Sequence, residues 1–135
     1  MSDKSDIQIV DAIIEKASIA QLEFEKNGSQ KAYDMAAQAV GWAIMEPSRN
    51  KELAELAVLT TGLGNVKDKI IKNHRKTLGL LRDISDVKTF GIIENNEENG
   101  IIKIARAIGV IGAVVPSTNP IATPANNIIN ALKCG

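Results

Sequence analysis

The sequence predicts an α/β fold in which four helices are followed by a β-hairpin and then by one strand and one helix of a parallel sheet. Three observations support this prediction. Apolar residues recur at three- and four-residue spacing over most of residues 6–83, which is the period of an amphipathic helix. Short β-branched runs then occupy residues 89–105. An apolar run over residues 109–115 precedes a last helical pattern, as in a βα unit.

Two helices are expected at the start of the chain. Residues 6–25 alternate apolar and acidic side chains at helical spacing, and Asn27-Gly28 ends the pattern. Ser29 is suited to cap a second helix, which stops at Pro47 because proline cannot continue a helix. We expect the two helices to form a hairpin and the first to be a core helix. Packing is also expected of three large side chains on the second helix, Met35, Trp42 and Met45.

Two more helices are expected in the same region. The third covers residues 50–61, and Gly62 suits the left-handed backbone that ends many helices. The fourth runs from about residue 65 to residue 83. As the only histidine, His74 is expected to be packed and hydrogen-bonded, and the alternative is a general base with a polar partner in reach. The predicted buried face of this helix is Val66, Ile70, His74, Thr77 or Leu78, and Leu81.

The sequence period changes after Ser85. Residues 89–93 and 101–105 are short β-branched runs on either side of a polar segment, which predicts a β-hairpin. Residues 109–115 are apolar on both faces, as in a strand at the centre of a parallel sheet. This predicted strand ends at Pro116.

A helical pattern resumes from about Thr123 to Leu132, and the sequence stops at Gly135. A parallel strand needs a parallel neighbour after its crossover helix, and none follows here. The sequence is therefore expected to be cut off within an α/β unit. The predicted organisation is an amino-terminal helical region (1–85), a β-hairpin (86–107) and the start of a sheet domain (108–135).

Charge and cysteine content restrict the class of partner. Sixteen basic and sixteen acidic residues cancel, so the chain has no overall field that would gather nucleic acid or an anionic membrane. Cys134 is the only cysteine, which excludes an internal disulfide and fits a reducing, cytoplasmic compartment. No secretion signal or membrane span is expected, because the longest apolar run covers only residues 108–115.

Two segments carry a resemblance to a known family. The turn Val115-Pro116-Ser117-Thr118-Asn119-Pro120, with the helical residues 122–132 after it, resembles the strand-to-helix connection of the aldehyde dehydrogenase superfamily. Ser117-Thr118, where the superfamily has tryptophan, is similar to the coenzyme-A-acylating branch. The glycine-rich turn and lysine-asparagine-histidine element in residues 61–74 resemble the same branch. Residues 75–83 are most similar to its sulfoacetaldehyde dehydrogenases.

The resemblance implies an incomplete aldehyde dehydrogenase fold, in which residues 108–135 begin a Rossmann-like, NAD(P)-binding domain. It implies oxidation of a small aldehyde, with sulfoacetaldehyde the suggested one, by NAD or NADP through a cysteine thioester that passes to coenzyme A. No metal is implied, and the full-length enzyme is expected to be a homo-oligomer. The family's nucleophile lies further along the chain than Cys134, so residues 1–135 alone are expected to be inactive.

The resemblance also suggests which residues form the site. Asn119 aligns with the family asparagine whose side-chain amide stabilises the oxyanion formed when the thiolate adds to the aldehyde. The alternative is that Asn119 only caps or turns the chain between two prolines. The expected cofactor-binding residues follow the predicted strand, where open α/β sheets bind ligands. They are Val115, Pro116, Ser117 and Thr118, and the alternative is an ordinary loop with Ser117 or Thr118 as a helix cap.

Two further features have open interpretations. The fourth helix could attract coenzyme phosphates, although a solvated basic face is favoured; its cations are Lys67, Lys69, Lys72, Arg75 and Lys76. The alternative role for the first helix is that of a docking peptide, since some microcompartment-borne relatives carry one.

Two alternatives to the function are considered: a non-acylating aldehyde dehydrogenase and a non-catalytic helical interaction domain. An unpaired apolar strand over residues 108–115 also predicts that the chain alone is poorly soluble or oligomeric.

Overall fold

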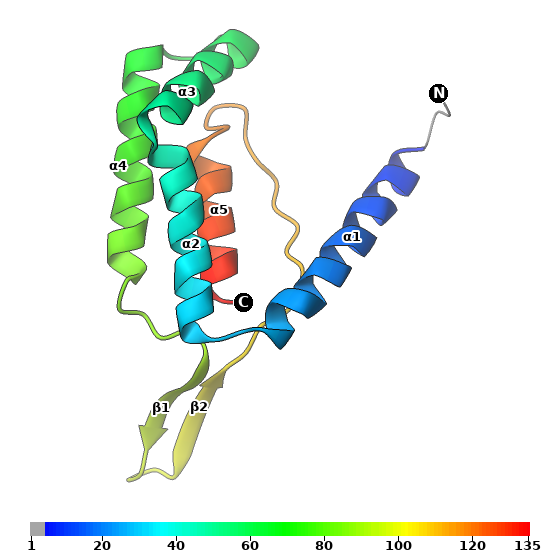
Figure 1. The fold of residues 1–135 in the computed structure, drawn as a ribbon, viewed down its shortest axis with the longest axis vertical. Coiled ribbons are helices and arrows are strands. Elements are labelled where there is room, and N and C mark those ends of the chain that lie inside the picture. The colour runs from blue at the N-terminus through cyan, green and yellow to red at the C-terminus, as the bar shows by residue number, and fades with distance from the viewer. Residues whose placement is uncertain (1–4) are drawn as a thin grey trace.

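The computed structural model describes residues 5–135, and within them the chain forms five helices and one two-stranded sheet. Helices α2 (Gln30–Met45), α3 (Pro47–Thr61), α4 (Val66–Ile84) and α5 (Ala122–Lys133) gather into one cluster. The first helix and the hairpin project from the cluster in different directions (Figure 1). No helix in the described residues has the length and apolarity needed to cross a membrane.

The core lies where α2, α4 and α5 meet. Each of these helices packs against the other two, and α3 packs against α2 and α4. Gly41 brings α2 close to α4, because a Cβ at this position would lie 2.4 Å from Leu81 Cδ1. The other helical residues that are buried and apolar are mostly small, namely Tyr33, Ala37, Ala54, Ala57, Ala122, Ala125 and Ile129.

The expected helix boundaries are largely confirmed, because the capping residues act as predicted. The Ser29 hydroxyl accepts a hydrogen bond from the Ala32 amide at 3.1 Å, and Gly62 ends α3 in the left-handed region at φ 66°. Asn65 caps α4 in the same way as Ser29 caps α2. Helix α3 starts earlier than expected, at Pro47, because the missing amide hydrogen of proline is not needed in the first turn.

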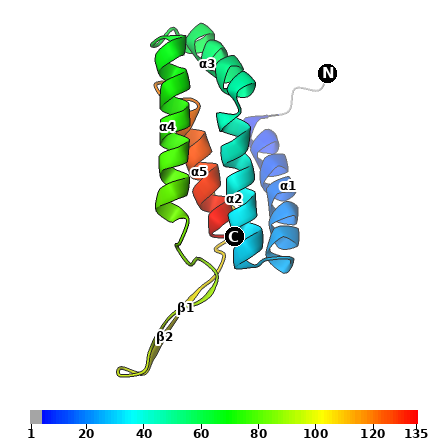
Figure 2. The same ribbon diagram turned by 60° about the vertical axis from the view of Figure 1, so that its left-hand side comes forward.

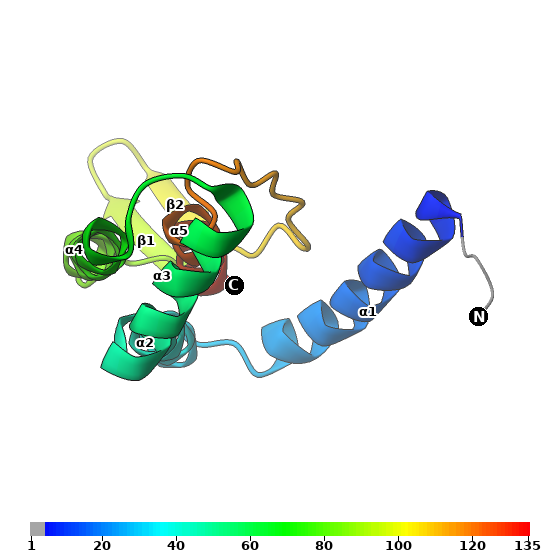
Figure 3. The ribbon, with the colours of Figure 1, turned by 90° about the horizontal axis from the view of Figure 1, so that it is seen from above.

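Helix α1 (Asp6–Lys26) does not form the expected hairpin with α2. No residue of α1 is buried, and the helix extends away from the cluster (Figure 3). Its attachments lie near its end: Gln21 Nε2 donates to the Gly135 carbonyl at 2.6 Å, and the Phe24 ring stacks on Tyr33 at 5.0 Å. The physical reason is that α4 and α5 already occupy the buried face of α2. The expectation of a core helix is therefore wrong within this chain.

The packing predicted for side chains of α2 and α4 is wrong in part. On α2 the buried positions recur every four residues at Tyr33, Ala37 and Gly41, so Trp42 turns outward and is 65% exposed, and Met35 is exposed as well. On α4 the buried residues are Lys69, Asn73 and Thr77, of which only Thr77 was expected. A polar contact accounts for which face of α4 is buried. Asn73 Nδ2 donates to Asn50 Oδ1 at 3.0 Å, which turns the face with Lys69, Asn73 and Thr77 toward α3. His74 is consequently exposed and makes no hydrogen bond within residues 5–135.

The predicted β-hairpin is present. Strands β1 (Gly91–Asn96) and β2 (Ile101–Ala105) pair antiparallel, with an irregularity between Ile92 and Glu94. The hairpin extends beyond the helical cluster (Figure 2). The isoleucines on both of its faces are at least 43% exposed. Its base is held by Gln30, whose side-chain oxygen accepts a hydrogen bond from the Thr89 amide at 2.8 Å.

The expected strand over residues 109–115 is not formed in this chain. These residues run as an extended segment that pairs with no other strand in the described residues. The sheet in residues 5–135 consists of β1 and β2 only. Ile108 and Val114 are 91% and 96% exposed. A strand that is apolar on both faces depends on neighbouring strands and covering layers, and residues 5–135 supply none beside it.

Candidate functional site

The segment that carries the predicted site is a tight turn at the start of α5. The Asn119 amide donates to the Pro116 carbonyl at 3.3 Å, and the Asn119 carbonyl accepts from the Thr123 amide at 3.4 Å. Ile121 and Ala122 directly after it are buried, so the turn is fixed to the helical cluster on its carboxyl side. The backbone of Asn119 is therefore held by the fold while the residues before it remain on the surface.

The Asn119 side chain has unused hydrogen-bonding capacity. Its Oδ1 atom is enclosed without a hydrogen-bond partner in the described residues, and its Nδ2 atom donates to none of them. The side chain does not cap α5, because the cap position is Ile121 and no side chain bonds to the first turn. An amide that is fixed by its backbone and has a free N–H group can donate to an oxyanion that forms during a reaction.

The predicted cofactor-binding residues Val115, Pro116, Ser117 and Thr118 are all exposed. Neither hydroxyl in this stretch makes a hydrogen bond within residues 5–135, and neither caps α5. Their polar groups are therefore available to a ligand, and the helix-cap alternative is not what the structure contains.

Thr118 lines a small cavity together with the start of α4. Helices α4 and α5 run in the same direction, and their amino-terminal ends lie at the same end of the cluster (Figure 1). The cavity has a volume of about 160 Å³. Its other lining residues come from the α3–α4 turn and the first turns of α4: Leu63, Gly64, Asn65, Asp68, Lys69 and Lys72.

Lys69 is the functional candidate that sequence reasoning assigned incorrectly. The basic residues of α4 were expected to be solvated, but Lys69 is only 5% exposed. No hydrogen bond or salt bridge to its ammonium exists in the described residues. The signal that was available is the helical spacing of Lys69, Asn73 and Thr77, which places three polar residues on one face.

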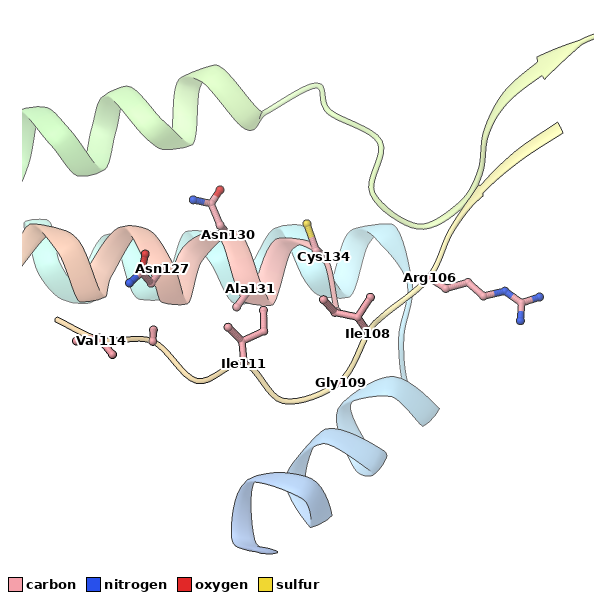
Figure 4. Close-up of a pocket in the computed structure, with 11 residues that line it drawn as sticks. Arg106, Ile108, Gly109, Ile111, Val114, Asn127, Asn130, Ala131 and Cys134 are labelled. Carbon is pink, nitrogen blue, oxygen red and sulfur yellow. The ribbon is translucent and has the colours of Figure 1, made fainter. Parts of the chain in front are cut away.

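A second, larger groove separates α5 from the unpaired segment before the turn (Figure 4). It has a volume of about 470 Å³ and is lined mainly by apolar side chains such as Ile108, Ile111 and Val114. Cys134 lies at its edge, exposed at the end of α5, with no histidine or carboxylate in hydrogen-bond contact. A nucleophilic cysteine requires an activating partner, so this thiol has no feature of a catalytic one.

Metal ligands do not cluster in the described residues: no group of three or more histidine, cysteine, aspartate or glutamate side chains lies together there. The perturbed carboxylate nearest α5 is Asp34, whose pKa is lowered chiefly by the hydrogen bond from Lys133. This pair joins two helices and takes no part in the turn at residues 115–120. The chemistry available at the turn is therefore that of hydrogen-bond donors and cations.

Comparison with known proteins finds relatives of which this chain matches a part. No family model matches the chain. It is 58% identical over 128 residues to the acylating sulfoacetaldehyde dehydrogenase of Cupriavidus necator, which covers 95% of this chain and 26% of that protein. It is 37% identical over 122 residues to the acetylating succinate-semialdehyde dehydrogenase of Clostridium kluyveri, covering 90% of this chain and 26% of that protein.

Solved structures give the same result. An acetylating aldehyde dehydrogenase from Geobacillus thermoglucosidasius superposes with a TM-score of 0.87 at 37% identity, covering 95% of this chain and 28% of that one. A probable aldehyde dehydrogenase from Listeria monocytogenes gives the same TM-score at 32% identity, with the same coverage. The chain thus spans about a quarter of the length of the relatives it matches. The resemblance predicted from the turn and the glycine-rich element is confirmed: in sequence and in fold, the chain is similar to part of the acylating aldehyde dehydrogenases.

Proposed function

We propose that this chain is part of an enzyme that oxidises a small aldehyde to its acyl-coenzyme-A thioester. NAD or NADP would accept the hydride and coenzyme A would accept the acyl group. The attacking thiolate would come from outside residues 1–135, because Cys134 has no activating partner within residues 5–135. The names of the relatives support the acylating reaction over release of a free acid, since several are called acylating or acetylating.

Asn119 is proposed to stabilise the oxyanion that forms when the thiolate adds to the aldehyde. The observation that carries this proposal is the combination of a fixed backbone and a side-chain amide with no partner in the described residues. A neutral donor that is already in place costs no reorganisation when charge appears on the substrate oxygen. The start of α5 adjoins the amide, and its positive end favours the same developing charge.

Residues Val115, Pro116, Ser117 and Thr118 are proposed to form the floor beneath the NAD(P) cofactor. Their exposure and their two free hydroxyls fit hydrogen bonding to a ribose or a phosphate. Residues 108–135 would then begin the NAD(P)-binding domain, with residues 109–115 becoming a strand once neighbouring strands are present. The two-faced apolar character of that segment supports this arrangement.

The proposed substrate is sulfoacetaldehyde. Three of the matching proteins, including the one that is 58% identical, carry that name. We further propose a cytoplasmic homo-oligomer. The single cysteine fits a reducing compartment, and the exposed isoleucines on both faces of the β1–β2 hairpin fit burial against another subunit.

Product analysis tests this function. An enzyme of the relatives' length that contains this chain should convert sulfoacetaldehyde to sulfoacetyl-coenzyme A when NAD or NADP and coenzyme A are both present. Omitting coenzyme A should abolish steady-state turnover, because the thioester then has no acceptor. Formation of free sulfoacetate at the same rate without coenzyme A would instead assign the enzyme to the non-acylating class.

A further inference from the structure

The cavity at the start of α4 is lined by a lysine whose side chain is mostly buried. Lys69 is 95% removed from solvent, since 5% of its surface is exposed. Lys69 lines the cavity, and its ammonium has no hydrogen-bond or salt-bridge partner in residues 5–135. The Lys69 stem is therefore packed against the fold, and its unpaired ammonium is available to an anion that enters the cavity.

The turn before α4 is shaped to let this lysine reach the cavity. Gly64 has φ +74°, a conformation that favours glycine, and a Cβ placed there would lie 3.7 Å from Lys69 Cε and 4.0 Å from Nζ. The lysine side chain thus lies against the backbone of the turn. The ammonium is held at the amino-terminal end of the helix, where unpaired backbone N–H groups also attract negative charge.

Other groups around the cavity add to its positive character. Lys72 lines it one turn further along α4, and the Thr118 hydroxyl is a free hydrogen-bond donor from the opposite segment. Asp68 is the one carboxylate in the lining, and it is already engaged by Asn65, whose Nδ2 donates to it at 2.7 Å. Two lysines against one aspartate leave the cavity with a net charge of +1.

We propose that this cavity binds a sulfonate or phosphate group, with the Lys69 ammonium as its principal partner and Lys72 and Thr118 as supporting ones. The proposal rests on the proposed function and specifies its recognition chemistry. Thr118, which lines the cavity, directly precedes the proposed oxyanion donor Asn119 in the chain. In sulfoacetaldehyde one carbon separates the sulfonate from the reacting carbonyl, which suits adjacent sites for the two groups. A phosphate of coenzyme A or of the nucleotide has the same recognition chemistry.

The test compares Lys69→Met with Lys67→Met in the complete enzyme. Methionine keeps the length of the lysine stem and removes the charge, and Lys67 is an exposed lysine on the same helix that does not line the cavity. If the anion is the substrate sulfonate, the KM for sulfoacetaldehyde rises at least tenfold in Lys69→Met, while the KM for propanal stays within twofold. If it is a cofactor phosphate, the KM for coenzyme A or the nucleotide rises instead. Lys67→Met leaves every constant within twofold.

The proposal is overturned if all of these constants stay within twofold of the wild-type values in folded Lys69→Met enzyme. Because Lys69 is enclosed, that variant can fail to fold, and Lys72→Met and Thr118→Val then take its place with expected KM increases of about threefold. Unchanged constants in both would equally overturn the site. If the wild-type enzyme acylates no aldehyde, calorimetric titration with methanesulfonate and with inorganic phosphate decides the question separately. If the wild-type enzyme binds either anion and the Lys69 or Lys72 variant does not, the anion site stands without the proposed reaction. If the wild-type enzyme binds neither anion, the anion site is overturned.

Discussion

Lys133 at the end of α5 donates to Asp34 on α2, with 2.5 Å between Nζ and Oδ1, and the lysine is only 4% exposed. Gln30 Nε2 donates to the same carboxylate oxygen at 2.8 Å and to Thr89 Oγ1 at 3.2 Å. The Thr89 hydroxyl in turn donates to the Lys133 carbonyl. One polar cluster therefore ties the carboxyl end of α5 to α2 and to the base of the hairpin.

Removing one partner of this pair should loosen α5. We expect Asp34→Asn to lower the local free energy of opening of α5 by roughly 2–3 kcal/mol, because it leaves an enclosed ammonium without a charged partner. The matched control is Glu94→Gln, which breaks the exposed pair with Lys103 and should cost at most about 1 kcal/mol. Amide hydrogen exchange of α5 in Asp34→Asn and in Glu94→Gln measures the free energy of opening of this helix in each variant. Equal protection of α5 in both would contradict the role assigned to the pair.

The Asp34–Lys133 pair should make the stability of the fold depend on pH. The hydrogen bond from Lys133 holds the pKa of Asp34 below its ordinary value of 3.8, and burial opposes this only in part. A carboxyl whose folded-state pKa is depressed stabilises the fold above its unfolded pKa, and this contribution disappears as the pH falls through the folded value. The difference in stability between wild type and Asp34→Asn should therefore be full at pH 6 and shrink below about pH 3.8. Thermal melts from pH 2.5 to 7 test this, and a constant difference across the range would rule it out.

Gly41 and Gly79 should respond oppositely to alanine. A Cβ at Gly41 would lie 2.4 Å from Leu81 Cδ1, so Gly41→Ala crowds α2 against α4 and should destabilise the fold by about 1–2 kcal/mol. A Cβ at Gly79, also within a helix, meets nothing within 4 Å, and Gly79→Ala should stabilise the fold by up to about 1 kcal/mol. Urea midpoints of the two variants provide the comparison. Adding Leu81→Ala to Gly41→Ala should recover part of the loss, and no coupling between the two would refute the contact.

Residues 1–135 expressed alone should self-associate. Apolar side chains remain exposed on α1, on both faces of the hairpin and along residues 108–115. Surfaces of this kind, including strand edges without neighbours, are those through which chains aggregate. Sedimentation velocity measures the state directly. A monodisperse monomer that melts cooperatively would show that the exposed segments do not drive association.

The helix boundaries and the hairpin could be predicted because their signals are local. Ser29, Pro47 and Gly62 each fix the backbone within one turn, so the sequence around them is sufficient. The packing partners could not be predicted in the same way. Helix α1 is amphipathic whether or not α2 has a free face, and this face is already taken by α4 and α5. Residues 109–115 read as a strand, but strand formation needs neighbours that residues 5–135 do not contain.

The candidate site was predictable where family resemblance supplied it. The turn at residues 115–120 is found where expected. Asn119 turns the chain through its backbone but does not cap α5, so only the capping part of the alternative is excluded. Lys69 was missed because a basic helix in sequence looks like a solvated face. The contact between Asn73 and Asn50, which sets the phase of α4, joins residues that are 23 positions apart. The matches to acylating enzymes also disfavour a non-catalytic helical domain.

The role of Asn119 as oxyanion donor is tested most directly by the acylation rate of Asn119→Ala in the complete enzyme. Losing one oxyanion donor should lower kcat for acyl-coenzyme-A formation by roughly 100- to 1000-fold at unchanged thermal stability. Asn99→Ala, an exposed asparagine in the hairpin turn, serves as the control and should keep its activity. A folded Asn119→Ala enzyme with the wild-type rate would contradict the assignment of Asn119 as the oxyanion donor.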